Sequence, residues 1–144
     1  MKKKLGFIGG GINSVVGNAH ICASQMDNLF TISSGIFSKN LKTSLKTSKE
    51  WNIASGNYGS IDEFIKKEKK NLDAVVVLTP TPDHYTHVKK LLNNGINTIC
   101  EKPISSRYNQ ALELSRLQKK NKVFLATTYN YTGYPMIREI KYLI

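Results

Sequence analysis

The sequence predicts an α/β fold: a single domain in which a doubly wound parallel sheet carries helices on both faces. Two observations lead to this class. Short segments rich in β-branched and aromatic residues alternate with segments of helical periodicity along the whole 144-residue chain. In addition, the segment "DAVVVL" is continuously apolar and bounded by turn residues, which is typical of a strand buried between two helix layers.

Local signals place the elements of the first half of the chain. Phe30–Ser38 has the composition of a strand, and Ser60 with Glu63 forms a capping box, a pattern that begins many helices. The sequence therefore predicts strands over Lys3–Gly9 and Phe30–Ser38, and helices over Asn13–Asp27, Leu41–Asn52 and from Ser60 to about Lys70.

The second half continues the alternation. Pro80 and Pro82 indicate a loop, Gly95 occupies the position of a glycine that ends a helix, and Pro103 ends a strand. The sequence predicts strands over Asp73–Leu78, Asn97–Glu101 and Val123–Thr127, and helices between Pro82 and Gly95, over Tyr108–Lys119 and from about Tyr134.

The composition is that of a globular protein. Apolar residues make up 40% of the chain, and no apolar run approaches the roughly 20 residues of a membrane span. The basic N-terminus precedes too few apolar residues for a signal peptide. We therefore expect a soluble, cytoplasmic protein with no membrane partner.

The net charge of +11 raises the alternative of nucleic-acid binding, which predicts duplex affinity that falls steeply with salt. However, the cations are scattered along the chain, and only three of the 21 are arginine, the better reader of bases and phosphates. The pattern favours a solvated lysine-rich surface and no nucleic-acid partner.

The cysteines and histidines do not form a metal-binding pattern. Cys22 and Cys100 lack a CxxC partner, so we expect buried, reduced thiols. His84 and His87 lie three residues apart, but two histidines alone do not make a metal site. We expect His87 to be solvated and His20 to have only a packing role.

The stretch "LGFIGGGINSVVGNAH" has the glycine spacing of a dinucleotide-binding turn. Gly9 allows a tight turn after the strand, and Gly11 lets the backbone approach a pyrophosphate. Ser14 is small enough for the third position, and Gly17 gives further close approach. A tight turn without a ligand is the alternative, but the position in the first βα unit favours a dinucleotide site, with pyrophosphate at the helix N-terminus.

If the turn binds a dinucleotide, we expect the cofactor to be NAD or NADP. An NAD site usually has an acidic residue at the end of the second strand, but no acid occurs between Asp27 and Glu50. Ser38 can donate to a ribose hydroxyl or to a 2′-phosphate, and Lys39 would attract a 2′-phosphate. These residues give a weak lean toward NADP.

The stretch "VVVLTPTPDHYTHVKKLLNNGINTICEKP" resembles the Gfo/Idh/MocA family of oxidoreductases, which includes glucose–fructose oxidoreductase and inositol dehydrogenases. The family has an N-terminal Rossmann domain with a TP…H stretch followed by an EKP motif. The stretch "NYTGYPMIRE" is also similar to the family, and the resemblance extends from Leu5 to about Arg138. The matching residues are Thr79, Pro80 and His84, then Glu101, Lys102 and Pro103.

The resemblance implies a role for each motif. Lys102 would be the catalytic residue, because a lysine at the hydride-transfer centre can hydrogen-bond the reacting hydroxyl and stabilise charge on its oxygen. The Lys102–Pro103 bond is a candidate for the cis geometry. The implied cofactor contacts are Gly9, Gly11, Ile12 and Asn13 at the pyrophosphate, Ser38 and Lys39 at the adenosine ribose, Thr79, Pro80, Thr81 and His84 along the middle, Glu101 and Lys102 at the nicotinamide, and Asn130 at the cofactor edge.

The resemblance also implies a domain organisation. Residues 1–130 would form the dinucleotide-binding domain, and residues 131–144 would begin the connection to a C-terminal substrate domain that this sequence lacks. That domain would bind the substrate, supply a catalytic histidine and form the contacts of a homo-oligomer. The expected reaction moves a hydride between nicotinamide and a sugar, inositol or nucleotide-sugar carbon. A non-catalytic dinucleotide-binding or sensing module is the alternative.

Overall fold

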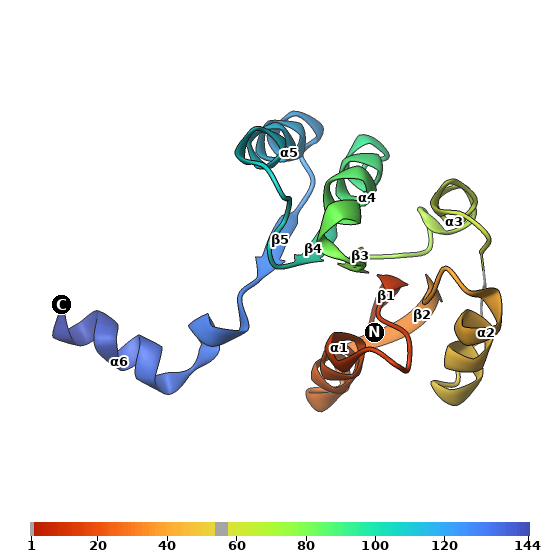
Figure 1. The fold of residues 1–144 in the computed structure, drawn as a ribbon, viewed down its shortest axis with the longest axis horizontal. Helices are drawn as coiled ribbons and strands as arrows, with labels where there is room; N and C mark the ends of the chain where they lie inside the picture. Colours follow the sequence, from red (N-terminus) through yellow and green to blue (C-terminus); the bar gives the residue numbers. More distant parts are fainter. Residues whose placement is uncertain (1, 54–57) are drawn as a thin grey trace.

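The computed structural model describes residues 2–53 and 58–144, which contain a five-stranded sheet. All neighbouring strands are parallel, in the order β2-β1-β3-β4-β5 (Figure 1). Because β1 lies between β2 and β3, the chain first builds one side of the sheet and then the other, which is the doubly wound arrangement that the sequence predicts. The strands are β1 (Lys3–Gly9), β2 (Phe30–Ile36), β3 (Ala74–Leu78), β4 (Thr98–Glu101) and β5 (Leu125–Thr128).

Helices cover both faces of the sheet. Figure 1 shows α1 and α2 on one face and α3, α4 and α5 on the other, which confirms the predicted fold class. The helices are α1 (Val15–Met26), α2 (Leu41–Glu50), α3 (Ile61–Glu68), α4 (Thr81–Asn93), α5 (Tyr108–Asn121) and α6 (Pro135–Leu143), with a 3-10 helix η1 (Asn130–Gly133) between β5 and α6.

Strand β3 supplies residues to two cores. Val75 and Val77 pack with the apolar residues of α3, α4 and α5, whereas Val76 and Leu78 pack on the opposite face with Phe7. Successive side chains of a strand point to opposite faces, so a strand between two helix layers needs apolar residues at every position. The continuous apolar run in the sequence has this cause.

The boundaries of two helices differ from those expected. Helix α4 begins at Thr81, before Pro82, because proline is tolerated in the first turn, where its missing N–H has no partner to lose. Helix α1 begins at Val15, and its N-cap Ser14 accepts a hydrogen bond from the Gly17 backbone N–H at 3.1 Å. Residues 12–13 therefore extend the turn after β1.

The expectation that both thiols are buried is wrong for one of them. Cys100 on β4 is buried, but Cys22 on α1 is exposed. Helix α1 buries Gly17 and Ser24, which lie two turns apart on one face, and Cys22 falls on another face of the same helix.

Helix α6 extends away from the rest of the molecule (Figure 1). None of its residues is buried, although Met136, Ile140 and Tyr142 are large and apolar. The proposed division between residues 1–130 and 131–144 stays a prediction. Among the described residues, no helix is both long and apolar enough to traverse a bilayer.

Candidate functional site

A cleft of about 1080 Å³ lies where β1, β2, β3 and β4 end. This is the carboxyl edge of a parallel sheet at the point where its winding reverses, the usual ligand site of such folds. Its volume is slightly above the roughly 300–1,000 Å³ range of ligand pockets. The predicted site residues that line it are Gly9, Gly11, Asn13, Ser38, Lys39, Thr79, Pro80, Thr81, His84, Glu101 and Lys102.

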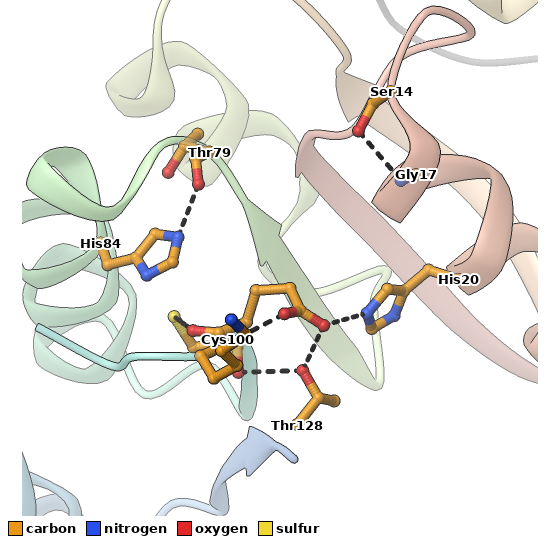
Figure 2. A network of polar contacts seen from close by, with 9 residues as sticks. Ser14, Gly17, His20, Thr79, His84, Cys100 and Thr128 are labelled. Atoms are coloured by element: carbon orange, nitrogen blue, oxygen red, sulfur yellow. Dashed lines mark hydrogen bonds and ion pairs between the residues drawn. The ribbon is translucent and has the colours of Figure 1, made fainter. Parts of the chain in front are cut away.

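The glycine turn brings the start of α1 very close to the end of β1. Gly9 and Gly10 have φ values of +83° and +71°, which favour glycine. A Cβ at Gly17 would lie 1.8 Å from the Gly10 carbonyl oxygen, so only glycine fits there. The glycine spacing predicts that Ser14 makes the close contact between helix and turn, but Gly17 makes it. Ser14 instead caps the helix (Figure 2).

Two predicted cofactor residues do not line the cleft. The Ile12 backbone N–H donates to Thr47 Oγ1 at 3.2 Å, and Thr47 Oγ1 in turn donates to the Thr43 carbonyl, which ties the turn to α2. Asn130 is exposed on η1. Contacts of Ile12 and Asn130 with a cofactor stay predictions.

His84 joins the two loops that follow β3 and β4. Its side chain is 1% exposed. Nδ1 lies 2.7 Å from the Pro103 carbonyl oxygen. Nε2 lies 2.6 Å from the Thr79 carbonyl oxygen (Figure 2). The Lys102–Pro103 bond is cis, as the resemblance implies. His84 thus connects the TP loop to the EKP loop at the cleft.

Glu101 connects three elements at the base of the cleft. Its Oε1 accepts hydrogen bonds from His20 Nε2 of α1 at 2.9 Å and from Thr128 Oγ1 of β5 at 2.6 Å (Figure 2). Its Oε2 accepts from the Lys102 backbone N–H at 3.1 Å. Burial raises the pKa of the Glu101 carboxyl, but these hydrogen bonds outweigh it and hold the pKa below its ordinary value.

The role of His20 was missed by sequence reasoning, which gave it only a packing role. A signal for it was nevertheless present, because His20 lies three residues after Gly17 and so shares the sheet-facing side of α1. Its partner Glu101 is 81 residues away in the sequence, and no local pattern relates the two.

A second group of charges lies at the ends of β2 and β3. Lys39 Nζ is 3.0 Å from Asp83 Oδ2, and this hydrogen bond holds the pKa of Asp83 below its ordinary value. His87 lines the cleft, with Nδ1 3.3 Å from Thr79 Oγ1. Burial lowers the pKa of His87. The expectation of a solvated His87 is therefore wrong, because α4 directs it toward the TP loop.

The thiol next to Glu101 is poorly suited to nucleophilic chemistry. Burial raises the pKa of Cys100 to about 12, so the thiol stays protonated at neutral pH. In the part of the chain that the structure describes, no three His, Cys, Asp or Glu side chains are grouped so as to hold a metal ion.

The comparisons with known proteins bear on the same residues. The pattern of the oxidoreductase family with an NAD-binding Rossmann fold, Gfo/Idh/MocA, matches residues 3–129. The chain belongs to this family. The matched region contains the glycine turn, the TP loop and the EKP loop, so the Gfo/Idh/MocA resemblance of the sequence is confirmed.

Relatives of the Gfo/Idh/MocA family are longer than this chain. The uncharacterized oxidoreductase YfiI of Bacillus subtilis (strain 168) is 26% identical over 146 residues, which cover 95% of this chain and 36% of YfiI. The chain thus spans well under half of the length of YfiI.

Solved structures agree with the fold. An oxidoreductase from Pseudomonas syringae superposes with a TM-score of 0.91 at 26% identity, covering 99% of this chain and 40% of that one. An inositol dehydrogenase homologue from Azotobacter vinelandii, complexed with NADH and myo-inositol, has a TM-score of 0.90 at 22% identity, covering 99% of this chain and 39% of that one. The second likeness supports the fold alone.

Proposed function

We propose that the chain is the dinucleotide-binding part of an oxidoreductase that transfers hydride between nicotinamide and a hydroxyl-bearing carbon of a sugar, inositol or nucleotide sugar. The cleft at the carboxyl edge of the sheet carries the proposal, because it joins a glycine turn to the TP and EKP loops. The chain spans 36% of YfiI and 40% of the Pseudomonas syringae protein. Substrate-binding residues and homo-oligomer contacts are proposed to lie outside the matched part.

The residues present suit a dinucleotide. A Cβ at Gly9 would lie 2.7 Å from the Leu78 carbonyl oxygen, so the turn leaves a bare backbone at the cleft. Gly11 and Asn13 would hold the pyrophosphate, and Ser38 with Lys39 would hold the adenosine ribose. The cofactor is NAD or NADP, and the preference for NADP that the sequence suggests rests on the positive charge of Lys39 taken alone.

Lys102 is the proposed catalytic residue. Its side chain is exposed at the cleft, and its backbone N–H is held by Glu101 Oε2 at 3.1 Å. The Lys102 ammonium group would hydrogen-bond the substrate hydroxyl and stabilise negative charge that develops on its oxygen. A bound nicotinamide supplies the chemistry of accepting or donating the hydride.

Titration of the purified chain with NADH and with NADPH, followed by nicotinamide fluorescence and calorimetry, tests cofactor binding. We expect saturable binding that Gly11→Asp abolishes, because a Cβ there would already lie 2.9 Å from the Phe37 carbonyl oxygen. Asn13→Asp is a milder variant, since Asn13 is exposed, and its negative charge should weaken binding about tenfold.

Gly133→Asp is the matched control, because nothing lies within 4 Å of a Cβ at that position. It should bind like the wild type. A folded chain that binds neither cofactor at millimolar concentration contradicts the proposal.

Lys102→Met separates an enzyme from a sensing module. In the protein that carries this chain, we expect the variant to keep its cofactor affinity within about twofold. Its oxidation of sugars and polyols should fall at least about a hundredfold. Wild-type protein that binds cofactor but turns over no sugar, inositol or nucleotide sugar would favour the sensing module.

A further inference from the structure

An ion pair lies at the edge of the cleft, where Lys39 lines the cleft and its partner Asp83 lies beside it. Lys39 follows β2, whereas Asp83 lies in the first turn of α4, directly after β3. Strands β2 and β3 flank β1 on opposite sides, so the 3.0 Å contact between Lys39 Nζ and Asp83 Oδ2 joins the segments that follow the two neighbours of β1. The side chains are 85% and 33% exposed, so neither is immobilised by burial.

The pair brings a carboxylate to a strand end that has none of its own. No acid follows β2 directly, and the neighbours of Lys39 are Ser38 and Asn40. Asp83 supplies a carboxylate there from a different element, α4. The Asp83 carboxylate is ionised at neutral pH, as an aspartate ordinarily is, and at 3.0 Å it offsets the positive charge of Lys39. The hydrogen bond with Lys39 holds the pKa of Asp83 below its ordinary value.

This arrangement opposes a 2′-phosphate. Such a phosphate carries roughly −1.5 to −2 charges at pH 7. If the phosphate approached Lys39, it would have to displace the Asp83 carboxylate or share the lysine with it. The carboxylate has the same sign of charge as the phosphate and lies 3.0 Å from the lysine nitrogen. A ribose 2′-hydroxyl carries no charge and can donate a hydrogen bond to a carboxylate.

We propose that Asp83, which lies beside the cofactor cleft, is a specificity-determining residue that neutralises Lys39 and disfavours the 2′-phosphorylated dinucleotide. The proposal rests on the proposed function, since it concerns how the same cleft chooses between NAD and NADP. The proposal removes the reason for expecting NADP. An unpaired Lys39 would attract a 2′-phosphate, whereas a Lys39 neutralised by Asp83 does not.

Calorimetric titrations of the wild type and Asp83→Asn with NADH and NADPH test the proposal. We expect the affinity of the variant for NADPH to rise about three- to tenfold, with no gain for NADH. The same contrast should hold for 5′-AMP and adenosine 2′,5′-bisphosphate, which probe the adenosine end alone. The gain should vanish in the double variant K39M/D83N and shrink in 1 M salt.

Asp62→Asn is the matched control. Asp62 also lies in the first turn of a helix, α3, and pairs with a lysine, Lys90, at 2.7 Å, but neither residue lines the cleft. This variant should leave the ratio of the NADPH and NADH affinities unchanged.

The outcomes distinguish the two proposals. A wild type that binds neither cofactor overturns the proposed function and, with it, the role of Asp83. A wild type that binds cofactor while Asp83→Asn leaves the affinity ratio unchanged, or lowers it for NADPH, overturns the role of Asp83 alone. A gain that persists in K39M/D83N shows that Lys39 is not involved and also overturns it.

Discussion

At the scale of single residues, Gly17 determines how closely α1 approaches the end of β1. In an open helix, alanine in place of glycine would add about 1 kcal/mol of stability. At this position, however, a Cβ would lie 1.8 Å from the Gly10 carbonyl oxygen, far inside van der Waals contact. The steric cost should therefore exceed the gain in helix propensity.

We predict that Gly17→Ala lowers the free energy of unfolding by at least about 2 kcal/mol and weakens cofactor binding, because the glycine turn must shift. Urea unfolding and NADH titration measure the two effects. Gly133→Ala is the control, since its Cβ would meet nothing within 4 Å, and it should stay within about 0.5 kcal/mol of the wild type. A Gly17→Ala variant as stable as the wild type would contradict the packing described for α1.

Glu101 gives a residue-scale prediction that depends on pH. Its pKa lies below the ordinary value of 4.5, so its ionised form stabilises the folded state. This contribution is complete above pH 4.5 and is lost as the pH falls through the lower, folded-state pKa.

The substitution Glu101→Gln should therefore lower the free energy of unfolding by about 1 kcal/mol at pH 7, because the hydrogen bonds to His20 and Thr128 become weaker. The loss should shrink well below pH 4.5, where the wild-type carboxyl is protonated. Urea unfolding at both pH values measures it, with Glu139→Gln on the exposed helix α6 as the control. A difference that does not change with pH would disprove the stated role of ionised Glu101.

At the scale of elements, the N-termini of α3 and α5 differ in whether a side chain caps them. Helix α3 has the Ser60 half of the capping box that the sequence predicts: Ser60 Oγ accepts from the Glu63 backbone N–H at 3.2 Å. The Glu63 carboxylate also reaches back, but it accepts from the backbone N–H of Gly59, one residue before the N-cap, at 3.0 Å. Helix α5 begins after Arg107, whose backbone is extended as an N-cap requires but whose side chain caps nothing.

Arg107→Asp should raise the free energy of unfolding by about 1 kcal/mol, because an aspartate can accept from the first free N–H groups of α5 and suits the positive end of the helix dipole. The urea midpoint measures the gain. Arg116→Asp, in the middle of the same helix and equally a charge reversal, should give none. If both variants gain equally, the cause is the reduced net charge and not the cap.

At the scale of the whole molecule, the sheet and the helices α1 to α5 form a packed body to which α6 contributes no buried residue. Removal of residues 135–144 should therefore change the free energy of unfolding by less than about 0.5 kcal/mol and leave the affinity for NADH unchanged. Thermal unfolding and calorimetry measure these quantities. A large loss of stability would show that α6 packs on the body in solution.

The predicted fold and the candidate site rest on different kinds of signal. The alternation of strand and helix patterns predicted the parallel sheet, and the ends of those strands predicted most of the residues that line the cleft. This inference succeeds because all strands of a parallel sheet end at one edge, so residues such as Lys39, Thr79 and Lys102 must gather there.

The sequence by itself therefore determined the fold class, the family and the edge of the sheet that carries the cleft, since these depend on local periodicity and on short motifs. Only the tertiary structure decided which side chains pair, namely His20 with Glu101 and Lys39 with Asp83. It also decided that the backbones of Gly17 and Gly10 lie in close contact. These contacts join residues on different elements. They depend on how each helix is rotated and how closely it packs on the sheet, and the packing of the whole core sets those distances.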